Sequence, residues 1–170
     1  MEQEERATMM LRNIVEMGKF SLELEDKREQ SIITQAGQML TSFSIITAVI
    51  LMLIPIVFEA TTYSKFHVFV ALAIISIPLL ISFVAALTAQ WRFKYESMQN
   101  IEEIYNAVFQ DHESYPDENS FRMQWIEQIK NVSKSKSKIN DRRVALVMVS
   151  MWAFFVAIIL SIILAAVIIF

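Results

Sequence analysis

Residues 144–170 read VALVMVSMWAFFVAIILSIILAAVIIF, a stretch of 27 residues without a charged side chain. As an α-helix it is about 40 Å long, enough to cross a hydrocarbon core of about 30 Å. Two further runs without Asp, Glu, Lys or Arg precede it, Gln30–Phe58 and Phe66–Trp91. Because backbone polar groups in hydrocarbon must pair within their own segment, we expect three membrane-spanning helices.

The composition favours an all-α integral membrane protein. Of the 170 residues, 55% are hydrophobic, against roughly 45–50% in an average soluble domain. Two glycines and three prolines indicate long helices rather than turn-rich β-structure, and the lack of cysteine excludes disulfides, thiolate metal sites and cysteine nucleophiles. We expect a cytoplasmic amphipathic helix (1–33), transmembrane helix 1 (34–58), an external loop (59–65), transmembrane helix 2 (66–90), a cytoplasmic helical hairpin with a basic linker (91–143) and transmembrane helix 3 (144–170).

The distribution of lysine and arginine predicts the topology. Five of these residues precede the first span, one lies in the loop after it, and nine lie between Arg92 and Arg143. The positive-inside rule therefore places the N-terminus and residues 92–143 in the cytoplasm, and Phe170 on the external, periplasmic face. The acidic first residues are unlike a signal peptide, so the spans themselves are expected to direct insertion.

The charged segments are predicted to be helical. Residues 4–30 carry apolar residues at spacings of three and four, so this helix either covers a neighbouring helix or lies on lipid; its glutamate-rich polar face opposes the second alternative. A seam from Trp91 to Val108 continues span two, and Asp117 is a predicted N-cap for a helix bearing Phe121, Trp125, Ile129 and Val132. These two helices are expected to pair as an antiparallel hairpin. The Ser133–Lys138 run with Arg142 and Arg143 is typical of contact with anionic headgroups, with binding of a phosphorylated ligand as the alternative.

Polar residues gather at the cytoplasmic end of the first span. Such side chains either hydrogen-bond a neighbouring helix or line the inner mouth of a pore, followed by an apolar constriction beyond Thr47. Pro78, in the middle of span two, is a predicted hinge because it removes a backbone donor. The pore-lining candidates are Thr34, Gln35, Gln38, Thr41 and Ser42.

Span three carries small residues at every fourth position from Ala145, which predicts a close helix contact within the chain or between copies. The packing candidates are Ala153, Ala157, Ser161 and Ala165. Three spans are too few to enclose a water path, so we expect a symmetric homo-oligomer in the lipid bilayer.

The sequence does not predict an enzyme. His67 and His112 are expected on opposite faces of the membrane, and Asp111-His112-Glu113 lacks the spacing of metal ligands. There is no glycine-rich phosphate loop or nucleophile elbow, and no span holds the ionisable residue of a coupled transporter. We therefore expect no catalytic residues, no metal and no cofactor.

The order of a cytoplasmic helix, a tight hairpin of two spans and an emergent helix reading Trp91-Arg92-Phe93-Lys94-Tyr95-Glu96 … Ile101-Glu102-Glu103-Ile104-Tyr105 resembles the SLATT family of small bacterial membrane effectors. The resemblance covers residues 10–110, and the third span departs from the family's core of two. It implies a pore-forming effector of anti-phage defence (abortive infection). Such an effector is controlled by a nucleotide second messenger from a partner nucleotidyltransferase, and it disrupts the integrity or potential of the bacterial inner membrane.

The leading functional hypothesis is an oligomeric ion channel or pore whose cytoplasmic helices form a ligand-responsive vestibule, with no role in reading nucleic-acid sequence. The alternative is a non-conducting membrane anchor or scaffold that recruits a partner through the hairpin. Candidate ligand contacts are cations for phosphate and aromatic rings for base stacking. They are Arg92, Lys94, Arg122, Lys130 and Lys134, with Trp91, Tyr95 and Trp125.

Overall fold

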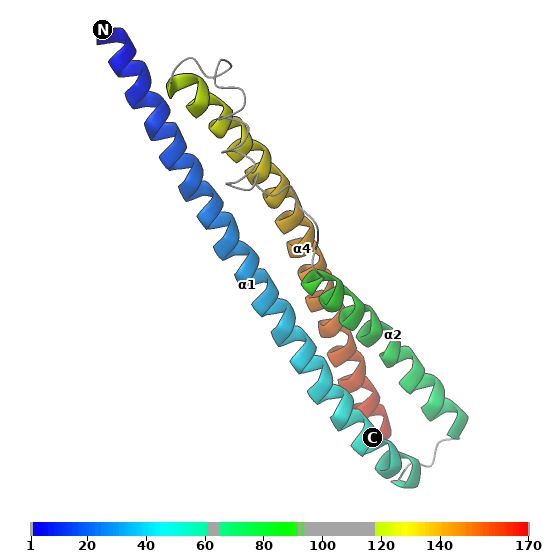
Figure 1. The fold of residues 1–170 in the computed structure, drawn as a ribbon. Helices are drawn as coiled ribbons and strands as arrows, with labels where there is room; N and C mark the ends of the chain where they lie inside the picture. The colour runs from blue at the N-terminus through cyan, green and yellow to red at the C-terminus, as the bar shows by residue number, and fades with distance from the viewer. Residues whose placement is uncertain (1, 61–64, 92, 94–117, 170) are drawn as a thin grey trace. The chain divides into compact units, whose positions relative to one another are not determined.

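The computed structural model describes residues 2–60, 65–91, 93 and 118–169, and all of these except Trp91 and Phe93 belong to three α-helices (Figure 1). They are α1 (Glu2–Ala60), α2 (Lys65–Gln90) and α4 (Glu118–Ile169). Each contains a stretch long and apolar enough to cross a membrane, so the expectation of an all-helical chain with three such helices is confirmed. The helices are long because the chain contains few glycines and prolines, the residues that disfavour a helix most. The two prolines within the helices, Pro55 and Pro78, occur in the apolar stretches, where membrane helices tolerate proline.

The chain divides into two compact units, and α1 and α4 contribute to both. The charged unit comprises residues 1–30 and 93–141, and the apolar unit comprises residues 31–92 and 142–170. The division follows the composition, because all residues from Gln30 to Phe58 lack a charge whereas charged residues recur throughout residues 2–29.

In the charged unit α1 and α4 lie side by side and run in the same direction (Figure 1). Thr8 is hydrogen-bonded to Asn119, Ser21 to Ser133 and Arg28 to Asp141, so the sequence numbers rise together along both helices. Between Thr8 and Glu25 the half-buried residues of α1 recur at intervals of three and four, which is the spacing of a coiled-coil seam. They are Thr8, Leu11, Val15, Gly18, Leu22 and Glu25.

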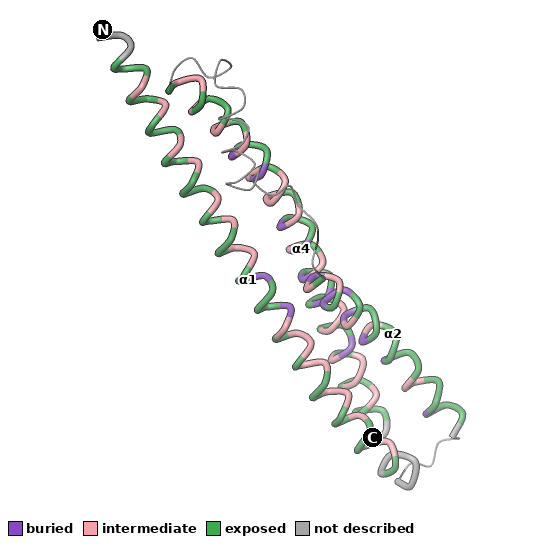
Figure 2. Tube along the Cα trace, viewed as in Figure 1, coloured by how far each residue is buried: buried purple, intermediate pink, exposed green. Residues whose placement is uncertain are grey.

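In the apolar unit all three helices contribute to the core, and buried residues lie on the faces that meet (Figure 2). Ile32 and Ala36 of α1 pack with Ala89 of α2 and Val147 of α4. A second cluster joins Ile75 and Leu79 to Ala157, with Phe43, Ile46, Ile50, Phe154, Leu160 and Leu164 around it. Many buried positions are small, which lets backbones approach closely where lipid supplies no hydrophobic drive. The small buried residues are Ala36, Ser82, Ala85, Ala86, Ala89, Ser150 and Ala157.

Two features differ from the expected organisation. The Ser133–Lys138 run, expected within a basic linker, is helical and belongs to α4, which continues without interruption to Ile169. The partner of α4 residues 118–141 among the described residues is α1, in parallel orientation. The predicted N-cap Asp117 and residues 94–117 of the predicted hairpin lie outside the described residues.

Candidate functional site

The polar end of the first span lies on the surface of the apolar unit. Thr34, Gln35, Gln38 and Thr41 are exposed and Ser42 is half-buried. The hydroxyls of Thr41 and Ser42 donate to carbonyls of their own helix, at Gly37 (3.1 Å) and Gln38 (3.0 Å).

The carboxamides of Gln35 and Gln38 form no side-chain hydrogen bond to any other residue that the structure describes. Neighbouring helices of the same chain therefore do not satisfy them within the described ranges. An amide that enters hydrocarbon without a partner costs several kcal/mol, on the order of 4–8 in the least polar reference solvent. These two side chains need water, headgroups or another protein chain.

The same exposed face of α1 becomes apolar further along the helix. Ile45, Val49 and Met52 follow Gln38 and Thr41 at intervals of three, four or seven residues and are 48–76% exposed. Ile50, one of the apolar residues beyond Thr47 where a constriction is expected, instead packs against the core of the apolar unit. The face thus passes from amides and hydroxyls to bulky hydrocarbon side chains within about three helical turns.

The small residues of span three do not share one face. Ala157 is 1% exposed and lies in the core, Ser161 and Ala153 are half-buried, and Ala165 is exposed. Each step of four residues turns an α-helix about 40° beyond a full turn, so a long ladder moves gradually around the helix. The buried line of α4 instead alternates between three and four residues. It comprises the buried Arg143, Val147, Ser150 and Ala157, with the half-buried Phe154 among them.

A buried serine pair joins α2 to α4 one turn beyond the predicted hinge Pro78. The Oγ atoms of Ser82 and Ser150 are 3.0 Å apart, and Ser150 donates to the Ser82 carbonyl at 2.9 Å. Because the Ser150 proton is used in that bond, Ser82 is the donor between the two hydroxyls. The sequence analysis missed this pair, although Ser82, Ala86 and Ala89 already show small residues at coiled-coil spacing.

Arg143 has a different environment from the one expected of a headgroup contact. Its side chain is 1% exposed, and Nη2 donates to the Trp91 carbonyl at 3.1 Å, directly after the C-terminus of α2. A cation at a helix C-terminus is favourable because the helix dipole is negative there. Arg142, by contrast, is exposed.

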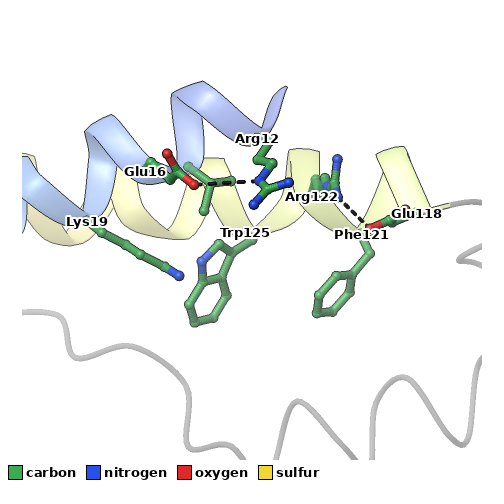
Figure 3. A pocket seen from close by; sticks show the side chains of 8 residues that line it. Arg12, Glu16, Lys19, Glu118, Phe121, Arg122 and Trp125 are labelled. Carbon is green, nitrogen blue, oxygen red and sulfur yellow. Dashed lines mark hydrogen bonds and ion pairs between the residues drawn. The ribbon is translucent and has the colours of Figure 1, made fainter. Parts of the chain in front are cut away.

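The charged unit contains a cleft between α1 and α4 of about 500 Å³, shown in Figure 3. This volume lies within the range of small-molecule sites, about 300–1,000 Å³. Its lining joins cations, carboxylates and aromatic rings from both helices. They are Arg12, Val15, Glu16 and Lys19 of α1, with Glu118, Phe121, Arg122 and Trp125 of α4.

The charges in the cleft have different partners. Arg122 is 21% exposed and is held by two bonds, from Nη1 to the Thr8 carbonyl (3.1 Å) and from Nη2 to Glu118 Oε1 (2.5 Å). Arg12 Nε lies 3.6 Å from Glu16 Oε1, and the Arg12 side chain is 72% exposed. Lys19 has no ion pair or side-chain hydrogen bond with the other described residues.

The cleft unites two of the predicted ligand contacts, Arg122 and Trp125, but not the others. Lys130 lines a separate pocket beside Gly18 and Ser133, and Lys134 is exposed. Trp91 lies at the end of α2 and is exposed, whereas Arg92, Lys94 and Tyr95 lie outside the described residues. Arg12 and Lys19 were missed, because alternating charges on an amphipathic helix are also typical of a solvated face.

No three His, Asp or Glu side chains among the described residues are grouped to hold a metal ion, and Asp111-His112-Glu113 falls outside those residues. Comparison with protein-family models, with curated proteins and with solved structures gave no match.

Proposed function

We propose that this chain is the subunit of a homo-oligomeric membrane pore or ion channel in which the polar face of α1 lines the inner mouth. The observation that carries the proposal is the exposure of Gln35 and Gln38 in a helix apolar enough to span a membrane, without a partner among the described residues. Facing lipid, both amides would remain unpaired. Facing a water-filled axis between copies, they are hydrated.

The rest of the α1 surface fits this arrangement. Ile45, Val49 and Met52 continue the exposed face and would form an apolar constriction beyond the polar mouth, of the kind that gates by dewetting. Three helices of one chain enclose no aqueous path, so several copies around a symmetry axis are required.

The biological setting belongs to the same proposal. The lysine and arginine distribution supports a cytoplasmic N-terminus and an external C-terminus. The resemblance to small bacterial membrane effectors supports an inner-membrane pore of anti-phage defence that a nucleotide second messenger controls. In that role, opening of the pore dissipates the membrane potential.

Ion flux from liposomes that contain the purified full-length chain tests the proposal. Flux is measured with and without a panel of cyclic and linear oligonucleotides, and wild-type protein is expected to conduct in at least one of these conditions. In the same condition the double variant Gln35→Leu/Gln38→Leu is expected to lose most of the flux because the inner mouth becomes apolar. Ser76→Leu is the matched control, since Ser76 is an exposed polar residue of α2 whose hydroxyl bonds only to its own helix, at the Leu72 carbonyl.

Equal flux from the double variant and the wild type, at equal oligomer mass, would remove α1 from the pore lining. Liposomes that stay tight under every condition, with correctly inserted protein, would favour the alternative of a non-conducting scaffold that recruits a cytoplasmic partner.

A further inference from the structure

We infer that the cleft between Arg12, Lys19 and Trp125 in the charged unit binds a nucleoside phosphate, with the base against Trp125 and the phosphate on Lys19 and Arg12. The regulatory consequence rests on the pore proposed above, whereas the binding does not.

The cations point to an anionic group. Lys19 lies in the cleft without an ion-pair partner among the described residues, and Figure 3 shows its side chain extending toward the Trp125 ring. Among the described residues the partner of Arg12 is Glu16, whose Oε1 lies 3.6 Å from Nε, and the guanidinium is exposed enough for its terminal nitrogens to reach a ligand. Charge-assisted hydrogen bonds from such groups to phosphate oxygens are about twice as strong as neutral ones. An uncharged ligand would instead desolvate the Lys19 amine without compensation.

Arg122 takes a different part from the one expected of it. Both terminal nitrogens are engaged, one by the Thr8 carbonyl and one by Glu118, so the guanidinium joins α1 to α4. It holds the two sides of the cleft together and is a positioning residue rather than a phosphate ligand. The anion therefore belongs at the α1 side of the cleft, where Arg12 and Lys19 are exposed.

The aromatic residues point to a planar ring. Trp125 and Phe121 are four residues apart on α4, and Figure 3 shows both rings on the same side of that helix. An indole face stacks on any nucleobase, and such stacking contributes about 1–3 kcal/mol per base.

The carboxylates discriminate among anions. Glu16 and Glu118 line the same cleft, so a bare phosphate meets repulsion that a larger ligand can avoid. Exocyclic amines of a base, or ribose hydroxyls, donate hydrogen bonds that carboxylates accept. A nucleoside phosphate combines ring, donors and anion in one molecule; an aromatic carboxylate lacks the donors, and pyrophosphate lacks the ring.

Calorimetric titration of the full-length chain in detergent tests the assignment, with ATP, cyclic di-AMP, adenosine, pyrophosphate and phenylacetate as probes. At least one of the two nucleotides is expected to bind more tightly than the other three probes. Lys19→Met is expected to weaken nucleotide binding about tenfold, through loss of a charge-assisted bond. Trp125→Leu is expected to weaken it by a similar factor through loss of stacking, while Trp125→Phe keeps part of the affinity. Lys134→Met is the control, since Lys134 is an exposed lysine of α4 outside the cleft.

The assignment is overturned if neither nucleotide binds, if pyrophosphate binds as tightly as the nucleotides, or if Lys134→Met weakens binding as much as Lys19→Met. Lys19 is exposed, so its replacement decides the outcome even if Trp125→Leu fails to fold, which circular dichroism reveals. Liposome flux is measured in parallel. Nucleotide binding without flux at any ligand concentration would support the binding site and contradict the pore. Flux without nucleotide binding would support the pore and contradict the binding site.

Discussion

Asn140 shows how a single polar residue fixes the packing of the charged unit. Its side chain is 1% exposed, and Nδ2 donates to the Glu25 carbonyl (3.1 Å) and to Glu25 Oε2 (2.8 Å). Arg28 lies beside the same carboxylate and pairs with Asp141 at 2.7 Å. A buried amide in a helix–helix seam sets register, because any shift along the helices leaves it without partners.

Replacing Asn140 by Leu is expected to lower the free energy of local unfolding of α1 in the charged unit by about 1–3 kcal/mol, because Glu25 loses both hydrogen bonds from Asn140 while remaining partly buried. Faster hydrogen–deuterium exchange of residues 2–30 is the readout. Asp141→Asn serves as the control, because an exposed ion pair contributes less than about 1 kcal/mol. Equal exchange in both variants would contradict a role of Asn140 in register.

The two glycines of the chain give a matched pair for testing helix packing. A Cβ atom on Gly18 would lie 2.7 Å from Ile129 Cγ2, whereas one on Gly37 would lie 3.1 Å from the terminal amide nitrogen of Gln90, which can rotate away. Gly18→Ala is therefore expected to destabilise the charged unit by about 1–3 kcal/mol from overpacking. Gly37→Ala is expected to be neutral or stabilising by up to about 1 kcal/mol, because alanine favours the helix. Exchange protection of each unit measures both effects, and a reversed order would show that Ile129 repacks freely.

At the scale of helices, α2 is held in the apolar unit by small residues and a few polar contacts. Ser82 and Ser150 form two hydrogen bonds between α2 and α4, and the ring of Phe83 packs on Phe43 of α1 with centroids 4.7 Å apart. The C-terminus of α2 ends beside the buried guanidinium of Arg143. These contacts are hard to recognise from the sequence, because serine and alanine also occur on other faces of α2 and α4.

Ser150→Ala is expected to weaken the α2–α4 contact by about 1 kcal/mol, from two bonds of about 0.6 kcal/mol each inside a membrane. Thermal unfolding in detergent, followed by far-ultraviolet circular dichroism, gives the measurement. Ser76→Ala is the comparison, because that hydroxyl bonds only to its own helix. A larger loss from Ser76→Ala would show that the serine pair does not hold the helices together.

At the scale of the whole chain, the three apolar helices and the lysine and arginine distribution together predict an orientation. The absence of cysteine from the sequence makes this directly testable with single introduced thiols. In intact cells a membrane-impermeant maleimide is expected to label Ser64→Cys, between α1 and α2, and to label Lys134→Cys only after lysis. The opposite pattern would place the basic residues outside the cell and remove a cytoplasmic ligand from the proposal.

The sequence by itself determined that three apolar segments are helical and suit a membrane. Long uncharged runs leave only a helix to satisfy the backbone in lipid, and this constraint is local, so the apolar parts of α1, α2 and α4 could be anticipated without knowledge of their partners. The polar end of the first span at Gln35 and Gln38 was visible for the same reason, since amides are rare in an apolar run.

Only the tertiary structure decided which faces meet. It placed α4 parallel to α1, so that Arg122 bridges the two helices. Arg12 and Lys19 share a cleft with Trp125 although they are more than 100 positions away from it in the chain (125 − 19 = 106). It also buried Arg143 at the end of α2 and left Ala165 exposed, against a pattern of small residues that suggested one continuous face. Side-chain spacing fixes the direction in which a residue leaves its own helix, but the neighbour it meets depends on the packing of distant segments.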